Sequence, residues 1–234
     1  MNGTLFLVGV GPGDPELLTL KAARILASVP VVAFPKKPGD FSLALNIARS
    51  HLNPDAELLP AGIPMQVNPG AAQSAYDALA GQLDKLLNAG KDVAYLCEGD
   101  PLFYGSANHL LSRLNSAHSI EIIPGITSLS ASAAAICRPL AARADVLKVL
   151  PATLGDDILQ RELANADAVV IIKTGRHLPR IRALLEQADL MESALITEHA
   201  SHEKQRIVPL SEYTPGEAPY FSTILCCRGA DRWK

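Results

Sequence analysis

The sequence predicts a two-domain α/β protein whose N-terminal domain contains a mostly parallel sheet. Short apolar runs alternate with helical patterns along nearly the whole chain, which is typical of parallel strands joined by helical crossovers. Gly- and Pro-rich turns separate these runs. The chain has 234 residues, 48% hydrophobic and 19% charged, which is enough for one large domain or two compact ones.

In the first half of the chain, five apolar runs are predicted strands. The first helix is expected from Pro15 to about Ala27, because Asp14 suits the N-cap and proline the first helical position. A helix over 71–88 ends at Ala89-Gly90, a usual C-terminal signature. The predicted strands are 4–8, 29–34, 57–60, 92–97 and 120–123, and two further helices are expected over 42–50 and from Ser128 through Ile136.

After Arg138 the alternation restarts, which predicts a second α/β domain. Its expected strands are 146–150, 168–172, 193–197 and 221–227, with helices over 156–164 and 178–188. The polar stretch 115–119 is the preferred boundary, which gives domains 1–119 and 120–234. The turn at 138–145 suits a boundary almost as well, so the division is expected between 115 and 145.

Charge and hydropathy argue against several classes of partner. The formal charge of −3 provides no basic footprint for nucleic acid. The apolar run 5–10 is too short for a signal peptide, and no stretch approaches the ~20 apolar residues of a membrane span. We therefore expect a cytoplasmic protein without nucleic-acid or membrane partners. The four cysteines form no CxxC pair and are expected to be small buried hydrophobes.

The first Gly-rich loop, 9–15, follows the first predicted strand but is not a dinucleotide fingerprint. Its glycines are spaced GxGxG, whereas the fingerprint requires GxGxxG. The second strand ends in Phe34-Pro35-Lys36, without the acidic residue that would hold a ribose, and no Gly-Lys-Ser/Thr follows the loop. Alone, the loop is compatible with a simple tight turn or with a nearby ligand.

Two later loops carry polar groups at strand ends. Gly99 allows a ligand to approach the backbone, and Pro101 is expected to begin a helix. The Asp100 carboxylate suits ribose hydroxyls or a sulfonium cation, but also a helix cap. The same two interpretations apply to the third loop, with Gly125 and the hydroxyls of Thr127 and Ser128.

Together these loops resemble the tetrapyrrole (corrin/porphyrin) methylase family. The matching stretches are 8–19, Gly99-Asp100-Pro101 and 124–128, in the family's order, and the resemblance covers essentially the whole chain. It implies two class III α/β domains flanking a cleft, with the N-terminal domain on the macrocycle side. It also implies a homodimer, a tetrapyrrole substrate, and S-adenosylmethionine as methyl donor with S-adenosylhomocysteine as product.

Further stretches resemble the branch of this family that methylates precorrin-2 at C20, giving precorrin-3A in cobalamin (vitamin B12) biosynthesis. They are 32–37, 97–105, 149–154, 173–179 and 219–222. Uroporphyrinogen III methyltransferases usually have Tyr-Asp where this chain has Phe34-Pro35, which argues against that branch. The alternatives are C20 methylation of cobalt-precorrin-2 (cobalt-factor II), methylation at another tetrapyrrole position, or, in another class, a non-catalytic nucleotide-binding module.

The resemblance also implies site residues. The donor site corresponds to Pro12, Gly99, Asp100, Phe103, Thr127, Ser128, Lys173, Ala200 and Tyr220. Relatives often have Met at Lys173 and Gly at Ala200. Substrate carboxylates require basic partners, of which Arg suits bidentate contact, although each such residue also fits a solvated surface. Candidate substrate contacts are Gly11, Gly13, Asp14, Lys36 and Arg176, with Lys37 and Arg206 as further basic candidates.

Methyl transfer from a sulfonium is an in-line displacement that depends on positioning and needs no metal. A base would help to remove the displaced proton, and Glu98, Tyr104 and His109 lie near the second loop. The histidines of the 198–203 segment lack the HExxH pattern. We therefore expect no metal site there.

Overall fold

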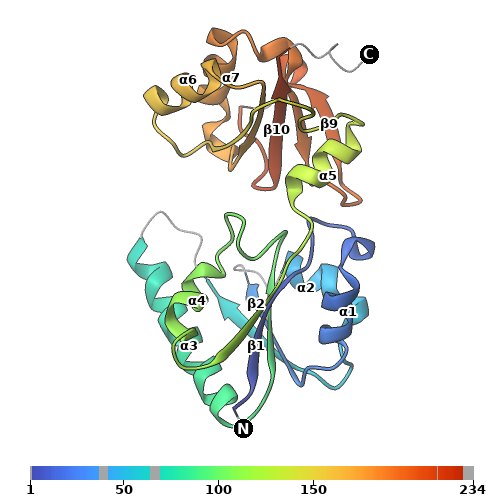
Figure 1. Cartoon of the computed structure of the whole chain (residues 1–234), viewed down its shortest axis with the longest axis vertical. Coiled ribbons are helices and arrows are strands. Elements are labelled where there is room, and N and C mark those ends of the chain that lie inside the picture. Colours follow the sequence, from blue (N-terminus) through green and yellow to red (C-terminus); the bar gives the residue numbers. More distant parts are fainter. Residues whose placement is uncertain (1, 37–41, 64–68, 215, 229–234) are drawn as a thin grey trace. The chain divides into compact units, whose positions relative to one another are not determined.

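The computed structural model describes residues 2–36, 42–63, 69–214 and 216–228. The chain forms two compact units, Met1–Thr127 and Ser128–Lys234 (Figure 1). The division falls inside the interval 115–145 expected from the sequence. The strand that follows residue 119 belongs to the first unit, because β5 (Ser119–Ile123) pairs in parallel with β1 (Thr4–Gly9).

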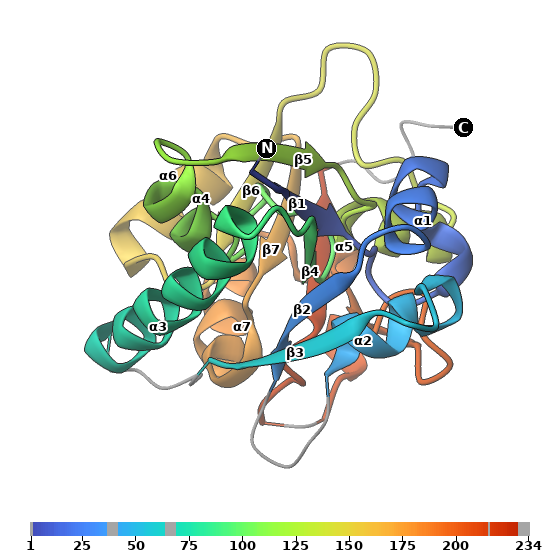
Figure 2. The same ribbon diagram turned by 90° about the horizontal axis from the view of Figure 1, so that it is seen from below.

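The first unit is built on a five-stranded parallel sheet in the order β3-β2-β4-β1-β5. The expected α/β class and the parallel N-terminal sheet are therefore confirmed. Crossover helices lie on both faces: α3 and α4 cover one, and α1 and α2 the other (Figure 2). The remaining strands are β2 (Val31–Lys36), β3 (Glu57–Gly62) and β4 (Val93–Cys97), and the helices are α1 (Leu20–Leu26), α2 (Leu43–Ala48), α3 (Pro69–Asn88) and α4 (Asn108–Leu114).

Two predicted helices of this unit were wrong in extent. The helix expected from Pro15 is a short 3-10 turn, η1 (Pro15–Leu17), after which Leu18 is extended. The α-helix begins only at Leu20, because the Thr19 hydroxyl caps it by accepting from the Ala22 N–H at 3.2 Å. Pro101 begins no helix either, since residues 101–107 form turns before α4.

The second unit is built on a mixed sheet in the order β6-β7-β10-β8-β9. Only β6 and β7 run parallel, while β10 is antiparallel to both its neighbours. Strand β9 was not predicted, because its apolar run is only the pair Ile207-Val208 between Arg206 and Pro209. The strands are β6 (Leu147–Pro151), β7 (Ala168–Ile172), β8 (Leu195–Glu198), β9 (Arg206–Pro209) and β10 (Ser222–Cys227).

Helices of the second unit also lie on both faces of its sheet. The apolar sides of α6 (Asp156–Ala164) and α7 (Leu178–Gln187) pack on one face of the sheet. They form one core there with strand side chains that point to that face, such as Ile171 of β7 and Ile224 of β10. Helix α5 (Ser128–Ala135) packs against β10 through the opposite set, which includes Thr223. Three 3-10 turns complete the unit's short elements among its described residues: η3 (Gly175–His177), η4 (Met191–Ser193) and η5 (Leu210–Glu212).

The cysteines are only partly as predicted. Cys97, Cys226 and Cys227 are buried and unbridged, but Cys137 is exposed, because it lies in the turn after α5 with a φ of 51°. Across the described ranges, no helix is both long and apolar enough to span a membrane.

Candidate functional site

Three glycines pack the loops at the carboxyl edge of the first sheet against one another. Strands β4, β1 and β5 are neighbours, so the loops that follow them meet. A Cβ on Gly9 would lie 2.7 Å from Cα and N of Gly125 and from O of Gly99. A Cβ on Gly125 would lie 2.1 Å from the same Gly99 oxygen. Only glycine allows this contact. Sequence reasoning missed the role of Gly9, although the three glycines recur at neighbouring strand ends.

Gly11 and Gly99 extend this contact beyond the sheet. Each accepts a hydrogen bond from the other, with N···O distances of 3.3 Å from Gly11 N and 2.9 Å from Gly99 N. Both have left-handed backbones, with φ of 81° and 67°, which favours glycine. Gly13 is buried beside them, Pro12 is half-buried, and the Asp14 side chain caps η1 by accepting from Glu16 N at 2.8 Å. The first loop is therefore held rigidly against the second.

Asp100 connects the second and third loops through its carboxylate. Oδ1 accepts from the backbone N–H groups of Leu102 at 2.9 Å and Phe103 at 3.1 Å, while Oδ2 accepts from Gly125 N at 3.0 Å. These three charge-assisted bonds leave one lone-pair position on Oδ2. The residue thus caps a turn rather than the helix predicted from the sequence, and its carboxylate fixes the positions of two loops.

The rest of the second loop is compact and strained. Tyr104 has a φ of 53°, which is unfavourable for an aromatic residue and typical of functional loops. A Cβ on Gly105 would lie 2.6 Å from the Pro101 carbonyl oxygen, so the loop closes tightly here. Leu102 and Tyr104 remain 47% and 45% exposed, and Phe103 meets the Tyr104 ring edge-on at 5.1 Å. The loop therefore presents apolar and aromatic side chains at the sheet edge.

The candidate proton acceptors lie around this loop. Glu98 is half-buried directly after β4, and His109 stacks on Tyr76 of α3 with a centroid distance of 4.5 Å. Burial raises the pKa of Tyr76 and, more strongly, that of Tyr95 on β4. Both tyrosines therefore stay neutral at physiological pH. Tyr104 is the most exposed of the three predicted candidates.

The second unit gathers another group of predicted residues at one end of its sheet. Lys173 follows β7, Ala200 follows β8, and Tyr220 precedes β10. Their loops are hydrogen-bonded together: Ala218 N donates to Gly175 O at 3.2 Å, and His199 N donates to Phe221 O at 2.8 Å. The structure thus brings Lys173, Ala200 and Tyr220 into one loop cluster. Ala200 is buried, whereas Lys173 and Tyr220 are exposed.

Thr127 and Ser128 lie where the two units join in the sequence. Thr127 closes the third loop, and Ser128 is the first residue of α5. The Ser128 hydroxyl accepts from the Thr223 hydroxyl at 3.3 Å, which fixes the start of α5 to β10. The Ser128 hydroxyl, for which a helix cap was one interpretation, is therefore hydrogen-bonded to a strand of the sheet.

The basic candidates are distributed over several elements. Lys36 is half-buried at the end of β2, beside β4 in the sheet, and Arg176 is exposed in η3. Next to it, burial and then the charges of Arg180 and Arg176 lower the pKa of His177, so that histidine is neutral at pH 7. Arg206 lies over the Tyr213 ring at 5.6 Å. Lys37 lies outside the described residues.

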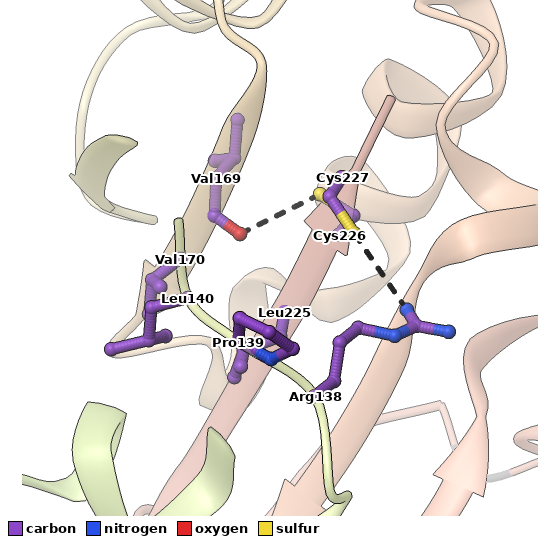
Figure 3. Close-up of a pocket in the computed structure, with 8 residues that line it drawn as sticks. All are labelled: Arg138, Pro139, Leu140, Val169, Val170, Leu225, Cys226 and Cys227. Atoms are coloured by element: carbon purple, nitrogen blue, oxygen red, sulfur yellow. Dashed lines mark hydrogen bonds between the residues drawn. The ribbon is translucent and has the colours of Figure 1, made fainter. Parts of the chain in front are cut away.

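A separate pocket in the second unit contains none of the predicted residues. Arg138, which follows α5 in the chain, donates to Ser193 O at 2.9 Å. The same side chain lies 3.9 Å from the Cys227 sulfur (Figure 3). Its lining residues are Arg138, Pro139, Leu140, Val169, Val170, Leu225, Cys226 and Cys227. Among the described residues, His, Cys, Asp and Glu form no group of three that could hold a metal ion.

Residues 4–214 match the family described as Tetrapyrrole (Corrin/Porphyrin) Methylases. The chain belongs to this family. Among solved tetrapyrrole methylases, the native uroporphyrin III C-methyl transferase of Thermus thermophilus has 27% identity and a TM-score of 0.72, with 99% of this chain and 94% of that chain covered.

Curated members of the methylase family are more similar still. The precorrin-2 C(20)-methyltransferase of Sinorhizobium sp is 40% identical, with 98% of this chain and 97% of the relative covered. The cobalt-precorrin-2 C(20)-methyltransferase of Salmonella typhimurium is 35% identical, with 96% of each covered. The cobalamin biosynthesis protein CobIJ of Mycobacterium tuberculosis is 40% identical over 99% of this chain, but the chain spans only 47%, about half, of that relative's length.

Proposed function

We propose that this chain is an S-adenosylmethionine-dependent C-methyltransferase that methylates precorrin-2 at C20 to give precorrin-3A in cobalamin biosynthesis. The observation that carries the proposal is the 40% identity, over nearly the full length of both chains, to a relative named for C20 methylation. The three tightly packed loops at the first sheet's carboxyl edge support it, because ligands of α/β sheets bind at that edge. The alternative substrate is cobalt-precorrin-2, in keeping with the Salmonella relative's name.

The donor fits the groups that these loops offer. Gly99 has no Cβ, and a Cβ there would come no closer to another atom than 3.9 Å, so a ligand can approach this backbone. When bound, S-adenosylmethionine supplies an electrophilic methyl group whose transfer leaves S-adenosylhomocysteine. In the loop cluster of the second unit, we assign buried Ala200, where relatives often have Gly, to the adenine side of the donor site. The proposed donor contacts are Pro12, Gly99, Asp100, Phe103, Thr127, Ser128, Lys173, Ala200 and Tyr220.

Asp100 acts mainly as a positioning residue in this proposal. Its carboxylate is occupied by three backbone N–H groups and has one remaining acceptor position for a donor hydroxyl. A rigid frame matters because in-line displacement requires the methyl group to lie within near-attack distance of the acceptor carbon. The hydrogen bonds between Gly11 and Gly99 supply the same rigidity to the first loop.

The substrate side is proposed to consist of Gly11, Gly13, Asp14, Lys36 and Arg176. The macrocycle carries carboxylates, for which Lys36 and Arg176 offer cationic partners. The exposed side chains of Leu102 and Tyr104 suit contact with its apolar face. The proton displaced at C20 requires an acceptor, and Glu98, Tyr104 and His109 remain our candidates. We further propose that the protein is a cytoplasmic homodimer without a metal cofactor or nucleic-acid partner.

Incubation with methyl-labelled S-adenosylmethionine and either precorrin-2 or its cobalt form tests the proposal. We expect one labelled methyl group per macrocycle, measured by mass spectrometry, with the faster acceptor identifying the substrate. Arg176→Ala should raise the KM for the macrocycle, whereas Arg161→Ala, which removes an exposed arginine paired with Glu162, should not. Donor binding without any transfer to either acceptor would favour a non-catalytic binding module and refute the proposal.

A further inference from the structure

A buried tyrosine–carboxylate pair lies beneath the loop cluster of the second unit. Tyr213 is 1% exposed and donates its phenolic hydrogen to Oε1 of Glu198, the last residue of β8, which is 8% exposed. Burial, and then the hydrogen bond to Glu198, raise the pKa of Tyr213 to about 12. Its hydroxyl is therefore a permanent donor at physiological pH. From the sequence, Glu198 was considered only as part of the 198–203 segment, as a possible metal ligand, and Tyr213 was not singled out.

The segment that follows Glu198 has an unfavourable backbone. His199 and Ser201 have φ values of 47° and 62°, on either side of the buried Ala200. Non-glycine residues adopt this conformation only when their surroundings enforce it. Hydrogen bonds within the segment contribute, since His202 N donates to His199 O at 2.9 Å and Ser201 N to the Gln205 side chain at 2.6 Å. Those bonds are local, while His199 N, which donates to Phe221 O at 2.8 Å, and the pairing of Glu198 with Arg206 attach the ends of the segment to the sheet.

Tyr213 adds a side-chain bond to these backbone attachments, and Tyr213 is itself fixed from several sides. Arg182 on α7 donates to the Tyr213 carbonyl oxygen, and the Arg206 guanidinium covers its ring. Farther along the same chain segment, Ala218 N donates to Gly175 O in the loop after β7. In that loop Lys173 also has a left-handed backbone, with a φ of 58°. The bond from Tyr213 to Glu198 therefore joins the residue before the 199–205 segment to a chain segment that is held by α7 and by the loop after β7.

We propose that Tyr213 and Glu198 are positioning residues for the methyl donor: their hydrogen bond holds the 199–205 segment in the strained conformation that donor binding requires. The inference rests on the proposed function, which assigns Ala200 to the donor. It adds that affinity for the adenosyl group depends on two side chains that need not touch the donor. Because both side chains are buried, we expect their loss to affect donor binding far more than the rate at saturation.

The test compares Tyr213→Phe with a matched control on the same strand. Thr197 precedes Glu198, is 1% exposed, and its hydroxyl has no hydrogen-bond partner within the described part of the chain. Thr197→Val therefore removes a buried hydroxyl without breaking a bond. We expect Tyr213→Phe to raise the Kd for S-adenosylmethionine at least 10-fold by calorimetry, with kcat at saturating donor within about 2-fold. Thr197→Val should leave both unchanged, and Glu198→Gln, which keeps an acceptor oxygen, should raise the Kd by less than 3-fold.

The hydrogen-exchange rates of the 199–205 amides in the ligand-free protein measure how firmly the segment is held, independently of donor binding. Faster exchange in Tyr213→Phe, but not in Thr197→Val, is the expected result. Unchanged exchange, or faster exchange with unchanged donor affinity, would overturn the inference, as would a parallel fall in kcat. If the wild-type protein bound no donor, the proposed function would fail instead, and the exchange data would still show whether the pair holds the loop.

Discussion

Replacing Gly125 by alanine tests the packing of the three loops in the first unit. The added Cβ would lie 2.1 Å from the Gly99 carbonyl oxygen, about 1.3 Å short of the 3.4 Å at which ordinary contact begins. The atoms that the Cβ would meet belong to the backbone of Gly99 and Gly9, so no side chain can move aside. Overpacking of this kind costs ~1–3 kcal/mol. The loops must also separate enough to break the 3.0 Å bond from Gly125 N to Asp100, which as a bond to a charged group contributes ~1.5–3 kcal/mol.

The sum is a loss of about 4 kcal/mol, which in a chain of this length lowers Tm by roughly 10 °C. Differential scanning calorimetry measures it directly. Gly81→Ala is the matched control, because a Cβ there meets nothing within 4 Å in the middle of α3. It should stabilise the helix by ~0.5–1 kcal/mol. A Tm for Gly125→Ala equal to that of the wild type would refute the account of the loop packing.

Three further predictions follow from individual side chains. Asp100→Asn places an amide N–H against a backbone N–H, so it should lower the free energy of unfolding by ~2 kcal/mol even without ligand, measured by urea titration. A thiol reagent should label exposed Cys137 rapidly in the native protein but Cys226 only on unfolding, since burial raises the pKa of its thiol to about 12; equal rates would contradict this. The raised pKa of Tyr213 implies that its neutral form contributes on the order of 3 kcal/mol to the free energy of unfolding. This contribution should be complete below pH 10 and lost as pH rises through about 12, and Tyr213→Phe should make stability depend less on pH in that range.

Much of the fold could be predicted because alternation of apolar runs is a strong signal. The helix Asp156–Ala164 and the strand Ala168–Ile172 agree with the sequence prediction at both ends. The error at Pro15 arose because proline and Asp14 suit a 3-10 turn as well as an α-helix. The turn ends where Thr19 offers a competing cap. Local propensity does not decide between two caps five residues apart.

The candidate site was predictable in its motifs but not in its internal bonds. The loops containing Gly99 and Gly125 were identified, yet the bond from Asp100 to Gly125 joins residues 25 apart, and only the sheet order brings them together. The same limit applies to Tyr213 and Glu198, whose contact depends on β9 pairing with β8 and on the turn η5 that follows β9. Tyr213 lies in no sequence motif, and the 198–203 segment that begins at Glu198 was considered only as a metal site. Packing between distant elements, rather than local pattern, determined these parts of the site.

Carbon-13 NMR of the product formed from ¹³C-methyl S-adenosylmethionine and precorrin-2 tests the central proposal most directly. C20 methylation predicts a single enriched methyl signal coupled to the C20 bridging carbon when that carbon is also labelled, with one S-adenosylhomocysteine released per macrocycle. An enriched methyl group on any other carbon would contradict the proposed position of transfer. Consumption of donor without an enriched macrocycle would contradict the proposed reaction itself.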